Sequence, residues 1–203
     1  MSGLDTLIAK SLYLSIKDSL GQKILQEVEQ RLFEKHGINI TQSIAEFHKL
    51  DSVLKDIFGE KAGGLEKKFL ENVVTIQEAE SQSFNWITVE DISLAILILE
   101  AFADNDKKNI LNTVIDEPRV ISEILEILEI PQTSGYRKVN VLIQNGMLIP
   151  EGFSITHDGK KVTKYKAVFE NISIEIEKNK VIVKVQPTNE SIENSHIMQI
   201  VCS

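Results

Sequence analysis

Apolar residues in the first hundred positions recur three or four places apart, which is the spacing of one face of an α-helix. The first such stripe consists of Leu4, Leu7, Ile8, Leu12 and Ile16. We expect Gly21 to interrupt this helix, because glycine is a weak helix former. A second stripe then continues to His36 and Gly37, where a glycine stop is expected. The pattern predicts that the chain begins with two long helical segments.

The next fifty residues predict two more helices and a loop. Thr41 is a good N-cap for a third helix that ends at Gly59, and a short fourth helix follows Gly63. Residues 75–87 are mixed and polar, which predicts a loop. Thr88 followed by Asp91 resembles a capping box, and it would open a helix over roughly 89–103. This helix is apolar nearly all round, which is typical of a buried central helix or of a dimer seam.

From residue 104 the chain predicts three short helices and then two hairpins. Asp104 or Asp106 would cap the first helix, and residues 145–146, Asn-Gly, would end the third. After that point apolar residues alternate, and residues 157–160, His-Asp-Gly-Lys, signal a hairpin turn. A second hairpin would pair residue 176 with 181, 174 with 183, and 172 with 185. That register puts every apolar pair on one face.

Three short helices followed by a β-hairpin are the layout of a winged helix. The fold class expected is therefore mainly α with a β-hairpin wing: an N-terminal helical domain, then a C-terminal winged helix-turn-helix extended by a second β-hairpin. The expected division is 1–87 for a helical output or sensor domain, 88–103 for a connecting apolar helix, 104–169 for the winged helix, 170–186 for the added hairpin and 187–203 for a loosely held tail.

Charge changes this picture by pointing to phosphate. The net charge of −8 argues against a chain coated with nucleic acid. Within residues 132–169, however, 6 basic and 2 acidic residues give a local net charge of +4. A basic patch on an acidic protein is a better indication of a phosphate partner than the total charge is.

Cysteine usage and hydropathy indicate a cytoplasmic protein. The single cysteine, Cys202, allows no disulfide within the chain, which fits a reducing compartment. The first ten residues, MSGLDTLIAK, lack the pattern of a signal peptide. The longest apolar cluster, residues 92–102, is far shorter than the roughly 20 residues of a membrane helix. We therefore expect no membrane partner.

The third short helix and the first hairpin supply the candidate DNA contacts. The start of the helix would place Tyr136, Arg137 and Lys138 side by side, where the N-terminal residues of a recognition helix reach base edges. Thr133 or Ser134 would cap that helix and donate to phosphate, and the lysines of the hairpin would meet the flanking backbone. The candidate DNA-binding residues are Thr133, Ser134, Tyr136, Arg137, Lys138, Asn140, Gln144, Lys160, Lys161 and Lys164.

Two stretches resemble known families. EPRVISEILEILEIPQTSGYRKVNVLIQNGML and the wing DGKKVTKY make residues 104–169 similar to archaeal ArsR-like winged helices. The resemblance implies a DNA-binding regulator whose recognition helix opens at Thr133, Ser134, Tyr136, Arg137 and Lys138. The chain departs from that pattern at Gly135, and it lacks a metal-sensing cysteine motif. Residues 4–74, above all FGEKAGGLEKKFLENV, are similar to the helical Nitrosopumilus output domain 5 family, which occurs with regulatory modules.

Plainer explanations remain for each of these features. The helix residues would otherwise form a solvated face, and the hairpin lysines would otherwise protect a sheet edge from pairing. The four histidines are scattered, no metal or cofactor motif is present, and no order of Ser, His and Asp indicates an enzyme. The expected function is a homodimeric transcription regulator that binds double-stranded DNA, with a possible protein partner at the N-terminal domain. The alternative is an adaptor whose winged helix docks on transcription machinery without reading sequence.

Overall fold

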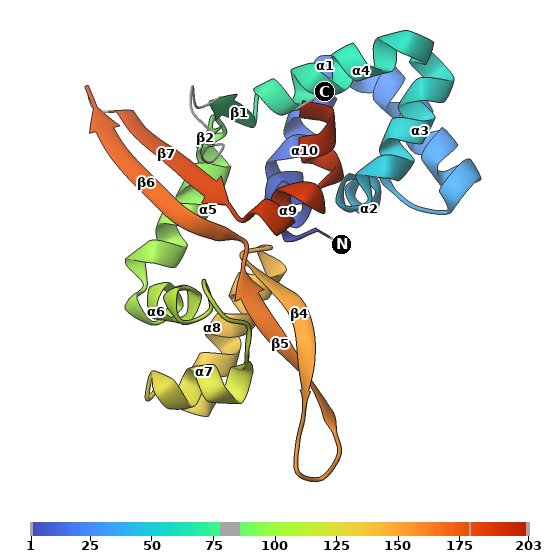
Figure 1. Cartoon of the computed structure of the whole chain (residues 1–203). Helices are drawn as coiled ribbons and strands as arrows, with labels where there is room; N and C mark the ends of the chain where they lie inside the picture. Colours follow the sequence, from blue (N-terminus) through green and yellow to red (C-terminus); the bar gives the residue numbers. More distant parts are fainter. Residues whose placement is uncertain (1, 78–85, 179, 202–203) are drawn as a thin grey trace.

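Helices come first and strands follow, in two antiparallel sheets, in the computed structural model, which describes residues 2–77, 86–178 and 180–201 (Figure 1). The N-terminal helices are α1 (Gly3–His36), α2 (Ile40–Ala45), α3 (Phe47–Phe58), the 3-10 turn η1 (Gly59–Lys61) and α4 (Ala62–Glu71). The interruption expected in α1 is present, because Gly21 has φ 70 and ψ 165. The single helix expected after Thr41 is wrong. Asn39 caps α2 through a capping box with Gln42, and the non-helical backbone of Glu46 (φ −116, ψ 60) separates α2 from α3.

Residues 75–87 were predicted to be a loop, but both ends of this range belong to strands. β1 (Val74–Gln77) and β2 (Trp86–Val89) pair with each other, while residues 78–85 lie outside the described residues. β2 also pairs with a strand nearly a hundred positions later, with Ile87 opposite Val185 and Val89 opposite Val183. A strand of four residues gives only two alternations, so its local signal is weak. It is held by pairing on both sides, with β1 and with that distant partner.

Helix α5 (Ile92–Ala103) follows β2. Its N-cap is Asp91, whose Oδ1 accepts from the Leu94 backbone N at 2.8 Å, whereas Thr88 lies in β2 and caps nothing. One side of α5 is buried through Leu94 and Ile98, and Ile92 and Ile96 on the other side are exposed. The expected burial on most sides is therefore only partly right.

The segment after α5 builds a three-stranded sheet packed with three helices. Its elements are α6 (Asn105–Thr113), β3 (Arg119–Val120), α7 (Ile121–Ile127), α8 (Gln132–Gln144), β4 (Leu148–Ile155) and β5 (Lys161–Ala167), with sheet order β3-β5-β4. Asp104 caps α6 as expected, accepting from the backbone N of Asp106 and of Lys107. The hairpin turn is also confirmed, because Ile155 pairs with Lys161 across it.

Two longer strands complete the second sheet, whose order is β1-β2-β7-β6. They are β6 (Phe169–Glu177) and β7 (Lys180–Pro187). Their register pairs residue 172 with 185, 174 with 183 and 176 with 181, which confirms the expected pairing. The apolar residues therefore share one face of the hairpin.

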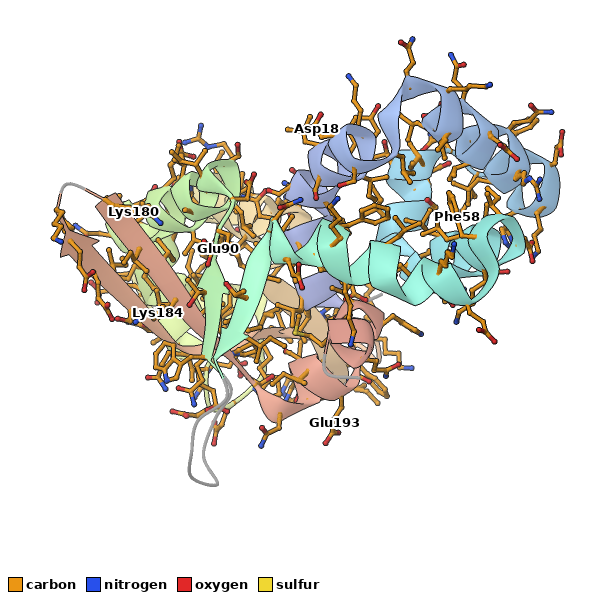
Figure 2. All side chains as sticks on the ribbon, turned by 90° about the horizontal axis from the view of Figure 1, so that it is seen from above. Asp18, Phe58, Glu90, Lys180, Lys184 and Glu193 are labelled. Atoms are coloured by element: carbon orange, nitrogen blue, oxygen red, sulfur yellow. The ribbon has the colours of Figure 1, made fainter. Side chains whose placement is uncertain are left out.

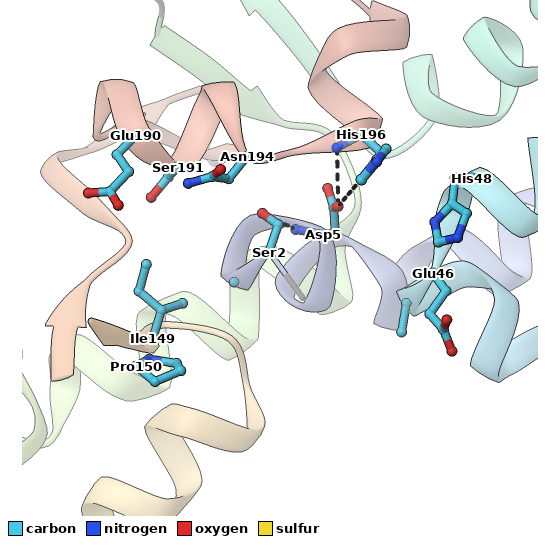
Figure 3. Close-up of a pocket in the computed structure, with 12 residues that line it drawn as sticks. Ser2, Asp5, Glu46, His48, Ile149, Pro150, Glu190, Ser191, Asn194 and His196 are labelled. Carbon is cyan, nitrogen blue, oxygen red and sulfur yellow. Dashed lines mark hydrogen bonds and ion pairs between the residues drawn. The ribbon is translucent and has the colours of Figure 1, made fainter. Parts of the chain in front are cut away.

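The expectation of a loosely held tail is wrong. α9 (Asn189–Glu193) and α10 (His196–Val201) close the chain, and Ser195, Ile197 and Met198 are buried. Asp5 of α1 holds the start of α10 by accepting from Ser195 Oγ at 2.5 Å. It also accepts from the His196 backbone N at 3.2 Å (Figure 3). Both helices are too short to give a periodic signal, and their anchor lies at the other end of the chain.

The start of α1 also packs on the end of α8. A Cβ added to Gly3 would collide with the side chain of Ile149 and lie 2.7 Å from Val168 Cγ2. Lys10 Nζ donates to Asn145 Oδ1 at 2.5 Å beside this contact. One continuous hydrophobic cluster therefore joins the N-terminal helices to the later elements. Within the described ranges, no helix combines the length and hydropathy required to cross a bilayer.

Candidate nucleic-acid interface

Helix α8 begins two or three residues earlier than expected, because its N-cap was predicted at Thr133 or Ser134. Pro131 occupies the N-cap position with φ −56, and Gln132 is the first helical residue. Neither Thr133 nor Ser134 is the cap, because both lie inside the first turn, where the Ser134 hydroxyl donates to the Pro131 carbonyl at 3.0 Å. Proline fixes φ and lacks an N–H, so it starts a helix without a side-chain cap.

The inner face of α8 attaches the helix to its neighbours. Val139 and Leu142 are fully buried, and Ile143 packs against the same core, as expected. Gly135 is buried too, and a Cβ at this position would collide with the side chain of Leu125 on α7. This glycine therefore allows α7 and α8 to approach closely.

The outer face of α8 carries five of the predicted contact residues. They are Thr133, Tyr136, Arg137, Asn140 and Gln144, all exposed and spaced three or four residues apart along the helix. These side chains supply hydroxyl, guanidinium and amide groups, which are the groups that hydrogen-bond base edges and phosphates. The structure thus brings most of the predicted helix contacts onto one accessible stripe.

Lys138 does not share that stripe. Its side chain is 18% exposed and turns toward the start of α6, where Nζ lies 2.7 Å from Asp104 Oδ1 and 3.0 Å from Asp106 Oδ2. The hydrogen bonds that Lys138 donates to these two carboxylates raise the pKa of Lys138, and the bond to Asp104 lowers the pKa of that carboxyl group. Lys138 therefore links α8 to α6, a role that the run Tyr-Arg-Lys does not reveal because the acidic partners lie 34 positions away.

We predict that Lys138→Met lowers the free energy of unfolding by about 1 kcal/mol at neutral pH, because the ion pair is only partly shielded from water. The lowered pKa of Asp104 makes this contribution present above that residue's ordinary pKa of 3.8 and lost as pH falls through the folded-state pKa. Chemical denaturation at neutral and acidic pH measures both effects. Arg137→Met, on the exposed stripe, is the control and should leave stability unchanged. An unchanged stability for Lys138→Met would show that the pair is not formed in solution.

The β4–β5 hairpin places its lysines differently. Lys160 is highly exposed and faces Asp158 at 2.8 Å, and Lys161 Nζ lies 3.6 Å from the centre of the Phe153 ring. Lys164 is half-buried on β5, where it lies opposite Val120 of β3. Lys160 and Lys161 at the tip are the two lysines best placed to meet a phosphate backbone. In Figure 1 this tip and α7 extend away from the N-terminal helices.

The hairpin also exposes two apolar side chains that the sequence did not predict to be exposed. Phe153 is 52% exposed and Ile155 is 67% exposed, two residues apart and so on one face of β4. Alternation along a strand shows that two residues share a face, but it does not tell which face meets water. These residues give the hairpin an apolar surface beside its lysines.

A second candidate site is the cavity of about 570 Å³ between α1, α2, α9 and α10 (Figure 3). Asp5 and His196 line it, with His196 Nδ1 4.0 Å from Asp5 Oδ2, and Ser195 precedes His196 in the chain. Ser195 is fully buried, donates to Asp5 and accepts from the Met198 backbone N, so its hydroxyl is not available as a nucleophile. Burial raises the pKa of Asp5, and the hydrogen bond from Ser195 opposes that rise. We interpret the cluster as a structural clasp.

No protein-family model, curated protein or solved structure matches this chain.

Proposed function

We propose that the protein is a DNA-binding transcription regulator in which residues 104–169 act as a winged helix. The observation that carries this proposal is the exposed stripe on α8, where Arg137 lies between Thr133 and Asn140 with no ion-pair partner among the described residues. An α-helix fits the width of the major groove, and its outward side chains then face the base edges. The β4–β5 hairpin serves as the wing.

The roles of the side chains follow from their donors. Arginine binds guanine O6 and N7 bidentately, and asparagine binds adenine in the same way, so Arg137 and Asn140 are the proposed base readers. Lys160 and Lys161 at the hairpin tip are proposed phosphate contacts, which position the protein without reading sequence. Lys138 is left out of the proposed interface because its side chain is only 18% exposed and is turned toward two carboxylates at the start of α6.

The N-terminal helices are proposed to receive the signal or partner. Gly3 and Lys10 of α1 contact the end of α8 and the residues that follow it. A movement of α1 would therefore shift the C-terminal end of the proposed DNA-binding helix. The tail helices α9 and α10 lie against the same end of α1. We propose that the regulator works as a homodimer in the cytoplasm.

Arg137→Ala tests the proposal. We predict a loss of about 1–3 kcal/mol on a preferred duplex and a much smaller loss on unrelated duplexes, because bidentate base contacts are sequence-specific. Lys161→Ala should weaken binding to all duplexes similarly. It should also reduce the slope of log affinity against log salt concentration by about one unit, as expected for a phosphate contact. Fluorescence anisotropy at two salt concentrations separates the two patterns. Lys67→Ala on α4 removes one exposed charge far from α8 and should change neither quantity.

The apolar surface of the wing favours a second candidate function. Phe153 and Ile155 would suit a protein partner in the transcription machinery better than a phosphate backbone. The affinity of such a contact changes little with salt concentration, whereas counterion release makes DNA affinity fall steeply as salt concentration rises. If Arg137→Ala and Lys161→Ala keep wild-type affinity for every duplex and a native melting temperature, the DNA-binding proposal fails and the adaptor takes its place.

A further inference from the structure

Strand β6 is the outer strand of the four-stranded sheet, and it is 9 residues long. It is paired with β7 on one side, and on its other side no strand pairs with it among the residues that the structure describes. Outer strands are normally protected from pairing by lysine, proline or covering elements. The stretch NISIEIE, residues 171–177, contains neither lysine nor proline. Figure 2 shows this hairpin, with Lys180 and Lys184 marked on β7, at the opposite end of the molecule from Phe58.

The register shows which groups face outward from β6. Glu177 and Lys180 flank the turn, so they form a hydrogen-bonded pair, and bonding to β7 alternates from there. The backbone groups of residues 172, 174 and 176 therefore point to the open edge. Their three isoleucine side chains share one face, and toward the tip this face is open to water: Ile174 is 45% exposed and Ile176 75% exposed.

We propose that β6 pairs in antiparallel fashion with β6 of a second copy of this chain, around a two-fold axis at Ile174. The two sheets then become one continuous sheet of eight strands. Ile174 lies opposite the partner's Ile174, and Ile172 lies opposite the partner's Ile176. Each of these pairs joins outward-pointing backbone groups and buries apolar side chains that are now exposed.

Charge complementarity identifies a second copy as the occupant. In this register Glu175 lies opposite the partner's Ser173, and Glu177 lies opposite the partner's Asn171, so no glutamate faces a glutamate. Near the ends of the paired segment, Glu170 comes close to the partner's Lys178, which has the opposite charge. A shift of the axis by one residue toward the tip would bring two copies of Glu175 together, which is unfavourable. The strand is thus complementary to itself in this register.

A groove beside β6 supports the same register. A cavity of about 290 Å³ lies between α5, α6 and the base of β6, with Phe102, Leu111, Ile172 and Ile174 in its walls. Because the partner's Ile176 would lie opposite Ile172, its side chain would stand next to this apolar groove. The dimer would therefore bury the groove together with the strand edge. This proposal does not rest on DNA binding, and its tests need no DNA.

Cysteine cross-linking tests the register. In a chain with Cys202→Ser, Ile174→Cys should form a disulfide-linked dimer on mild oxidation, because directly opposite residues have Cα atoms about 5.5 Å apart, within disulfide range. Ile176→Cys is the matched control on the same strand and is more exposed. The two copies of residue 176 would be roughly 13 Å apart, too far to cross-link. Cross-linking at 176 but not at 174 would overturn the proposed register.

Light scattering at micromolar concentration tests the dimer itself. The wild-type chain should have the mass of two copies, and Ile174→Lys should raise the dimer dissociation constant at least about tenfold, because it places a lysine in the apolar centre. Because Ile174 is partly exposed within one copy of the chain, the variant should still fold. Its melting temperature should equal that of a wild-type sample diluted until it is monomeric. Lys67→Ala, on the exposed surface of α4, is the control and should keep the dimer. A wild-type monomer, or a dimer unaffected by Ile174→Lys, would overturn the proposal.

Discussion

Replacing Gly146 by alanine is expected to lower the free energy of unfolding by roughly 3 kcal/mol or more, because two separate costs add. Gly146 has φ +75, a left-handed backbone conformation that side chains disfavour. A Cβ there would also collide with the carbonyl oxygen of Gly3 and lie 2.8 Å from the backbone N of Leu7. Backbone atoms of a helix cannot move aside as a side chain does. Urea unfolding followed by circular dichroism measures the loss.

Gly152 provides a matched control for this prediction. It has φ +76, almost the same backbone conformation, and a Cβ at that position meets nothing within 4 Å. Gly152→Ala should therefore show only the conformational cost, about 1 kcal/mol. The difference between the two variants isolates the contact between α1 and the end of α8. Equal losses would contradict the close packing of α1 against Gly146.

The elements that could be predicted from sequence are those with strong local signals. The turn at residues 157–160 and the alternation of isoleucine and valine in the second hairpin were enough to predict both hairpins, and the register of the second is confirmed. The position of α8 was predicted to within two or three residues at its start. In each case the residues that determine the structure lie within a few positions of one another.

The features that were missed depend on contacts between distant positions. β2 is defined by its pairing with β7, and the tail is held by Asp5, 190 positions before Ser195. Lys138 was predicted as a DNA contact because it follows Tyr136 and Arg137 on the first turn of the helix, whereas its partner Asp104 caps another helix. A local pattern places a side chain on a helix, but it does not tell which distant group that side chain meets.

The candidate site divides in the same way. The exposed stripe of α8 followed from helical spacing, because exposure on one face is set by burial of the other. The exposed apolar pair Phe153 and Ile155 did not follow, since the side of the hairpin that meets solvent is decided by how the whole sheet packs. A prediction of which residues contact a partner is thus strongest on a helix whose core face is evident.

The N-terminal helices contain a buried acid that should make stability depend on pH. Glu66 of α4 is 2% exposed, and burial, followed by the nearby Asp51 carboxylate, raises its pKa from 4.5 to about 7. Lys55, which pairs with Asp51 at 2.8 Å, opposes this rise only in part. The carboxyl group is therefore protonated in the folded protein over a range where it is ionised in the unfolded chain.

The sign of the effect follows from that raised pKa. The folded state binds the extra proton, so this stabilising contribution is complete below the unfolded pKa and is lost as pH rises toward 7. From about pH 5.5 to about pH 8 the loss amounts to roughly 2 kcal/mol. Glu66→Gln removes the titrating group. Between the lower and the higher pH, the free energy of unfolding of the wild type should therefore fall by roughly 2 kcal/mol more than that of Glu66→Gln. Glu71→Gln, an exposed position in the same helix, should follow the wild-type pH profile. If Glu66→Gln and Glu71→Gln show the same pH dependence in chemical denaturation, Glu66 ionises normally in the folded protein and the interaction with Asp51 is not formed.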